Sequence, residues 1–116
     1  MRENIIQIKS KAFAIRAIKL YKYLCEVKKE FVLSKQLLRS GTSIGANVRE
    51  SSRAQSNADF ISKMNIALKE ADETLYWLEL LMESDFIDKT EFNSLYSDAE
   101  ELVKILVSII KSAKKI

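Results

Sequence analysis

The sequence predicts an all-α protein, an antiparallel up-down-up-down bundle of four helices, and three observations carry that prediction. The 116 residues include no proline and only two glycines, so few positions favour a turn. Apolar residues recur every three or four positions through most of the chain, which is the period of an amphipathic helix. The chain contains no linker and no low-complexity segment, so residues 1–116 are expected to form one domain.

The first helix is expected at about residues 5–28. Its apolar residues share one face at 100° per residue, and they are Ile6, Phe13, Ala17, Leu20 and Leu24. Such a stripe packs against the rest of a bundle.

The second helix is expected at about residues 32–55 and contains both glycines, Gly41 and Gly45. Each glycine costs about 1 kcal/mol relative to alanine inside a helix. Four-residue spacing places both on one face, so we interpret them as a position where another backbone approaches closely. That backbone belongs either to the same bundle or to a neighbouring subunit.

Capping sequences place the two remaining helices. Ser56 is followed three residues later by Asp59, and Asp88 is followed by Glu91 at the same spacing. Both patterns are typical of a helix N-terminus, so a third helix is expected from residue 56 and a fourth from residue 88.

The third helix carries a second apolar patch away from its inner stripe. The patch consists of Ile66, Tyr76, Trp77 and Leu80. A helix that is apolar on two sides is buried on two sides, so we interpret these residues as an interface between copies. The alternative is that rotation of the helix buries some of them within one bundle.

A polar but uncharged stripe follows the second helix. It consists of Gln36, Ser40, Ser43 and Asn47, with Glu50 beside it. Hydroxyl and amide groups beside closely packed glycines favour hydrogen bonding across a helix–helix interface. A small polar site is the alternative.

Positive charge is concentrated in the first half of the chain. Residues 1–56 contain 12 Lys or Arg and 4 acids, whereas residues 57–116 contain 7 Lys and 12 acids. We interpret nine of these cations as a candidate nucleic-acid-binding surface: Lys9, Lys11, Arg16, Lys19, Lys22, Lys35, Arg39, Arg49 and Arg53. The alternative is a solvated face, or pairing with the acids of the third helix.

The composition disfavours most enzymes. The chain has no histidine, which is the commonest general base and metal ligand, and one cysteine, Cys25. We therefore expect no catalytic residue, no metal and no cofactor. No apolar run approaches the roughly 20 residues that span a bilayer, and no signal peptide is evident, so we expect a cytoplasmic protein without a membrane partner.

Three segments resemble the four-helix-bundle proteins of the 23S rRNA intervening-sequence family. They are QLLRSGTSIGANVRE at 36–50, AQSNADFISK at 54–63 and ALKEADETLYWL at 67–78. The resemblance implies a bacterial protein that forms a ring-shaped homopentamer. A related branch is the accessory variability protein of diversity-generating retroelements, for which the resemblance implies binding of nucleic acid and of a reverse transcriptase. It implies no catalytic residue.

Two functions therefore remain open at this point. In the first, the oligomer is a non-enzymatic accessory protein that binds RNA or DNA on its basic surface. In the second, it is a protein–protein interaction scaffold whose basic faces meet acidic faces of neighbours.

Overall fold

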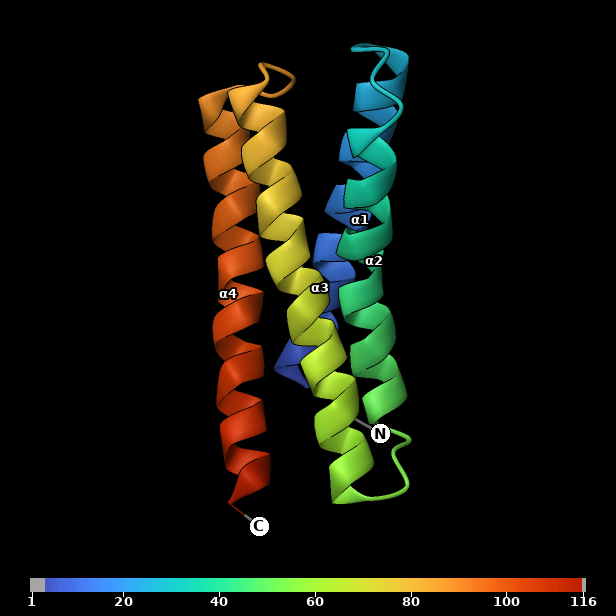
Figure 1. Ribbon diagram of the computed structural model, residues 1–116, viewed down its shortest axis with the longest axis vertical. Coiled ribbons are helices and arrows are strands. Elements are labelled where there is room, and N and C mark those ends of the chain that lie inside the picture. The colour runs from blue at the N-terminus through green and yellow to red at the C-terminus, as the bar shows by residue number, and fades with distance from the viewer. Residues whose placement is uncertain (1–3, 116) are drawn as a thin grey trace.

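The computed structural model describes residues 4–115, and these form four helices packed into an elongated bundle with principal extents of 47 × 23 × 20 Å (Figure 1). The helices are α1 (Ile5–Glu26), α2 (Leu33–Ser51), α3 (Asn57–Glu83) and α4 (Lys89–Lys114). Helices adjacent in the chain pack along much of their length, whereas α1 and α4 share a much smaller contact. No described helix is long and apolar enough to cross a membrane.

The predicted N-terminal caps of α3 and α4 are confirmed. The Ser56 side chain accepts a hydrogen bond from the backbone N–H of Asp59 at 3.0 Å, and Asp88 accepts one from the N–H of Glu91 at 2.8 Å. Each cap satisfies a backbone donor that has no partner within its helix. Asn4 caps α1 in the same way, and the Gln7 side chain accepts from its backbone N–H in return.

The second helix is shorter than predicted. It ends at Ser51 instead of continuing to about residue 55. Ser51 Oγ donates to the carbonyl oxygen of Val48 at 2.6 Å, and Ser52 Oγ donates to that of Arg49 at 2.7 Å. Serine hydroxyls compete with the backbone for these carbonyls, which explains the early end of the helix.

The first helix also ends before the predicted residue 28, at Glu26. Lys29 has a φ of 55°, the left-handed conformation that glycine most often supplies after a helix. The N–H of Glu30 donates to the carbonyl oxygen of Leu24 at 2.9 Å and closes this turn. The chain has no glycine at this turn, since both of its glycines lie inside α2, and Lys29 adopts the left-handed conformation instead.

The core lies along the facing sides of the helices. The five apolar residues predicted for the first helix are all buried. In α4, Ile110 is buried and Ile109 is half-buried. Tyr96 connects α4 to α3, since its hydroxyl donates to Glu79 Oε2 at 2.7 Å. That hydrogen bond, together with partial burial and nearby acidic charge, raises the pKa of Tyr96 to about 12.

Candidate nucleic-acid interface

The two glycines bring α2 against α1. A Cβ added to Gly41 would lie 2.8 Å from Ala17 Cβ, and one added to Gly45 would lie 3.4 Å from the backbone carbonyl of Ser10. The close approach predicted from the glycines is therefore present within the bundle. It fixes the α1–α2 pair on which eight of the nine predicted basic residues lie, and the ninth, Arg53, lies two residues past the end of α2.

Two of the nine basic residues pair with acids of α4. Lys9 Nζ lies 3.1 Å from Glu101 Oε1, and Arg16 Nη1 lies 2.7 Å from Asp98 Oδ2. Arg16 also donates to the side chain of Ser94 at 3.0 Å. These pairs bridge α1 and α4 at the surface, where an ion pair contributes roughly 0–1 kcal/mol.

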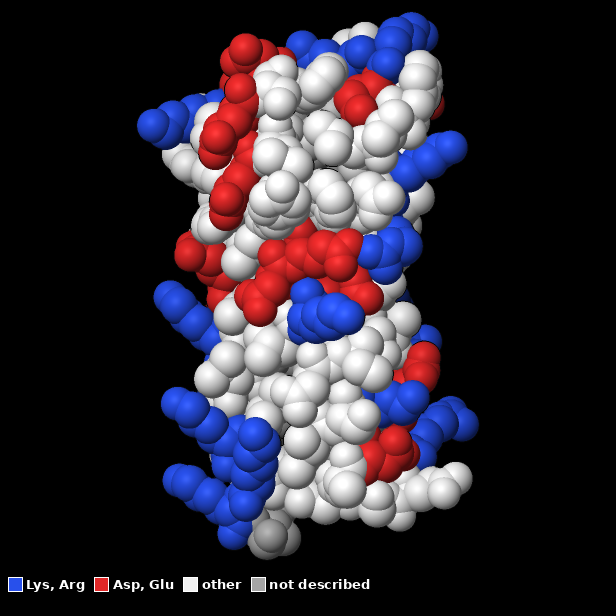
Figure 2. Space-filling view, in the orientation of Figure 1, with Lys and Arg blue, Asp and Glu red and all other residues white. Residues whose placement is uncertain are grey.

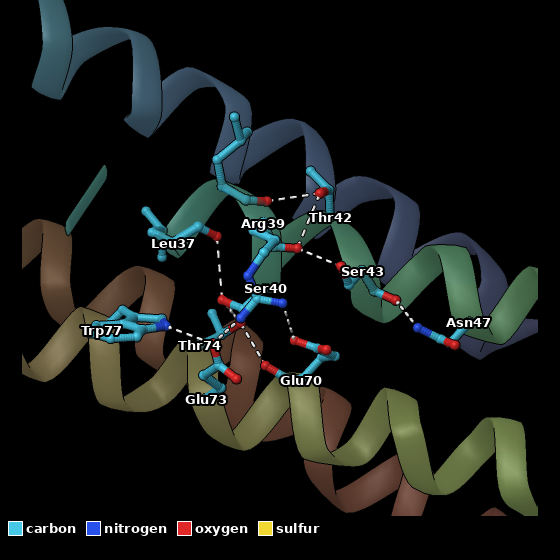
Figure 3. A network of polar contacts seen from close by, with 11 residues as sticks. Leu37, Arg39, Ser40, Thr42, Ser43, Asn47, Glu70, Glu73, Thr74 and Trp77 are labelled. Atoms are coloured by element: carbon cyan, nitrogen blue, oxygen red, sulfur yellow. Dashed lines mark hydrogen bonds and ion pairs between the residues drawn. The ribbon is translucent and has the colours of Figure 1, made fainter. Parts of the chain in front are cut away.

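Arg39 pairs with two acids of α3, and Figure 3 shows this cluster. The guanidinium is hydrogen-bonded to Glu73 and lies 3.6 Å from Glu70 Oε1. Trp77 Nε1 donates to the same Glu73 carboxylate at 3.2 Å. Glu70 Oε1 is buried and has no hydrogen-bond partner among the described residues. Arg39 is thus a neutralising residue between α2 and α3.

The polar stripe of α2 divides between two kinds of contact. Ser40 is buried, and its hydroxyl is hydrogen-bonded to Thr74 of α3 at 2.9 Å (Figure 3). Ser43 and Asn47 instead bond to backbone carbonyls of α2 itself, at 2.6 and 2.8 Å. Gln36 is exposed. Of the predicted stripe, then, Ser40 makes the hydrogen bond across a helix–helix contact.

Glu50, placed beside that stripe in the sequence, lies 3.2 Å from Lys63 Nζ of α3. On α3, Ile66 and Tyr76 are 39% and 54% exposed. Trp77 and Leu80 are half-buried, and Trp77 packs against the core. Within one chain, the apolar patch of α3 is therefore partly covered and partly open.

Six of the nine predicted basic residues make no ion pair with any residue in the range 4–115. Three of them converge on one groove between α1 and α2, which we call the basic groove and which has a volume of about 600 Å³. The ten residues that line it are Gln7, Ser10, Lys11, Ala14, Thr42, Gly45, Ala46, Arg49, Ser52 and Arg53. The other three unpaired cations are Lys19, Lys22 and Lys35.

A second groove, about 500 Å³ in volume, lies between α1 and α4. Arg16 and Lys19 line it from α1, whereas Asp88 and Glu91 line it from the start of α4. Acids therefore face the cations across this groove, and a polyanion would meet both signs of charge there.

Sequence reasoning missed a further group of basic side chains on α4. In Figure 2 they form a column over the C-terminal half of that helix, and acidic side chains gather over the middle and the opposite end of the same view. Lys111 and Lys114 lie in the last turn of α4. The net charge of residues 57–116 is negative, so summing charge over that half of the chain does not reveal these lysines. The seven-residue spacing of Lys104 and Lys111 nevertheless indicates that they share a helix face.

The four packed helices of the described residues define an all-α helical bundle. Residues 2–108 match the family model of the 23S rRNA-intervening sequence protein, and the chain belongs to that family. A crystal structure of a protein with unknown function from the S23 ribosomal protein family of Bacteroides thetaiotaomicron is 57% identical to this chain. The match covers 92% of this chain and 99% of that one, with a TM-score of 0.92. No curated protein matches the sequence.

Proposed function

We propose that this chain is a non-enzymatic, cytoplasmic, homo-oligomeric accessory protein that binds nucleic acid on the basic surface of α1 and α2. The observation that carries the proposal is the set of six exposed cations, five on these two helices and Arg53 just past the end of α2, that make no ion pair in the described part of the chain. A cation that already holds a carboxylate has little left to gain from a phosphate. A free one releases the counterions that phosphates condense, which is the main source of sequence-independent affinity.

The salt dependence of binding tests the proposal. If all six cations contact phosphates, the logarithm of affinity falls with the logarithm of salt concentration with a slope of about −5. Between roughly 50 and 200 mM salt, affinity for duplex DNA then falls by about 10³-fold. Titrating the wild-type protein with RNA and with DNA at both concentrations measures this. Absence of binding at the lower concentration, or binding that ignores salt, contradicts the proposal.

Arg39 is unsuited to a charge-reversal test of this surface. Its guanidinium neutralises Glu70 and Glu73, so a glutamate at this position would place three carboxylates together. Loss of binding by such a variant would report on the α2–α3 contact as well as on nucleic acid. Lys19→Gln/Lys22→Gln changes exposed residues outside both the ion pairs and the basic groove, and it is expected to weaken binding without changing the fold.

The second candidate function is a protein–protein interaction scaffold. It is supported by the exposed apolar side chains of α3. The pairing of Lys9, Arg16 and Arg39 with acids of the same chain leaves these three cations less available to nucleic acid. We propose in addition that the helices run up-down-up-down and that five subunits form a ring. A reverse transcriptase is the proposed protein partner. The mass of the protein in solution, measured with and without nucleic acid, tests the assembly.

A further inference from the structure

We infer that the basic groove is the principal phosphate-binding element of this surface and that its ligand is the backbone of a nucleic-acid duplex. The inference rests on the proposed function and adds the location and the class of ligand. The inference depends on three features of the groove: the positions of its cations, the small residues in its lining and the absence of aromatic side chains from that lining.

The cations stand on both walls of the groove. Lys11 lies on the α1 wall, and Arg49 and Arg53 lie on the α2 wall or just beyond its end. All three side chains belong to exposed residues. A phosphate between the walls meets positive charge from two sides, which concentrates the local potential more than the same charges spread along one helix would. Arginine adds a planar pair of donors that matches phosphate oxygens.

Small residues of both helices line the groove. They are Ala14 of α1 and Gly45 and Ala46 of α2, and Gly45 lies against the Ser10 backbone. With no large side chain in the way, a phosphate reaches the space between the cations. The polar residues Gln7, Ser10, Thr42 and Ser52 complete the lining.

The lining favours a duplex over a single strand. None of the ten residues that line the groove is aromatic. Proteins that hold single strands stack bases on aromatic side chains, at about 1–3 kcal/mol for each base. A groove with cations and no stacking platform reads the backbone alone, and a duplex presents twice the phosphate density of a single strand along its axis.

The other charged surfaces are less suited to binding phosphate. The groove between α1 and α4 mixes cations with Asp88 and Glu91. On α4, Lys104 shares a shallow hollow with Glu100 and Glu101. Lys111 and Lys114 lie in the last turn, where they also complement the negative end of the helix dipole. Those α4 lysines therefore supply a matched control.

The experiment compares two triple variants that remove the same charge. One is Lys11→Gln/Arg49→Gln/Arg53→Gln, and the control is Lys104→Gln/Lys111→Gln/Lys114→Gln. The probes are a short duplex DNA, the RNA duplex of the same sequence and each DNA strand alone. Circular dichroism and the mass in solution establish that both variants keep the wild-type fold and assembly.

We expect wild type to bind either duplex several-fold more tightly than a single strand. The groove variant is expected to lose about 2.7 from the magnitude of its salt slope on duplex DNA, which is three phosphate contacts, while the control retains the wild-type slope. If wild type binds and both variants lose the same amount, or the control loses more, the groove assignment is wrong. Equal or tighter binding of single strands overturns the duplex assignment. If wild type binds no probe, the proposed function itself fails.

Discussion

At the scale of single residues, the two glycines of α2 lie one helical turn apart and have different surroundings. A Cβ at Gly41 would lie 2.8 Å from Ala17 Cβ and 3.6 Å from the Phe13 ring. The Ala17 methyl is fixed to its backbone, so one helix must move to admit the new group. A Cβ at Gly45 would lie 3.4 Å from Ser10, an ordinary van der Waals distance. Gly41 is therefore required by packing, whereas Gly45 can be replaced by a slightly larger residue.

We predict that Gly41→Ala and Gly45→Ala change stability in opposite directions. Overpacking at Gly41 lowers the free energy of unfolding by about 1–2 kcal/mol. Alanine at position 45 raises it by up to about 1 kcal/mol, because alanine is the better helix former. Urea denaturation followed by circular dichroism measures both. The control is Ala17→Gly, measured alone and together with Gly41→Ala, because it removes the clashing methyl but itself costs about 1 kcal/mol in a helix. If Gly41→Ala destabilises the Ala17→Gly protein as much as it destabilises wild type, the packing explanation is wrong.

At the scale of the helices, the start of α2 depends on Glu30. The N-cap residue Val32 has no side-chain acceptor, and Glu30 supplies one from the preceding turn. Its carboxylate accepts hydrogen bonds from the backbone N–H groups of Val32, Leu33 and Ser34 at 2.7–3.1 Å. Partial burial acts to raise the pKa of Glu30, but these hydrogen bonds outweigh it, and the pKa lies below its ordinary value of 4.5.

We predict that this cap makes stability depend on pH. The folded protein holds a proton on Glu30 less tightly than the unfolded chain does. The stabilisation is therefore complete above about pH 4.5 and is lost as pH falls through the folded pKa. Glu30→Ala is expected to cost about 1 kcal/mol at neutral pH and less in acid. Denaturation of wild type and Glu30→Ala at neutral pH and in acid measures this. A difference in the free energy of unfolding between the two proteins that does not shrink in acid contradicts the prediction.

A second prediction at this scale concerns the hydroxyl pair between α2 and α3. Ser40 and Thr74 are both fully buried and hydrogen-bonded to each other. Thr74→Val keeps the shape but removes the partner of Ser40, and we expect a loss of about 1–2 kcal/mol. Ser40→Ala/Thr74→Val removes both groups and is expected to cost less than the sum of the single changes. A double-mutant cycle measures the coupling, and strict additivity would show that the pair contributes nothing across the interface.

The elements also show what the sequence can and cannot predict. Periodicity placed the buried residues of α1, and local capping patterns placed the starts of α3 and α4, since both depend on neighbours within a few positions. The partners of Arg16 and Arg39 lie 82 and 34 residues away along the chain. They depend on how the helices are rotated and aligned, which periodicity does not specify. The basic groove could not be predicted for the same reason, since it forms only when α1 and α2 are aligned so that Lys11 lies near Arg49 and Arg53.

At the scale of the whole molecule, exposed apolar side chains lie on both α1 and α3, but the charges beside them differ. The unpaired cations of the predicted surface lie on α1 and α2 or just past the end of α2, whereas α3 carries acids together with Ile66 and Tyr76. On α1, Ile8 and Ile15 are also exposed, at 50% and 47%. Exposed apolar side chains that gather on one face mark interaction surfaces. The question is which of these two faces joins copies of the chain.

We predict that α3 provides the contact between copies. Ile66→Glu/Tyr76→Glu replaces exposed apolar groups with charges that would be buried without a partner, so the mass in solution should fall toward that of one chain. These positions suit the test better than Trp77, because Trp77 packs against the core and its loss would also destabilise the bundle. Sedimentation at several protein concentrations measures the mass. Ile8→Glu/Ile15→Glu is the matched control on α1, and loss of assembly in that variant alone would assign the contact to α1, leaving α3 free to bind another partner.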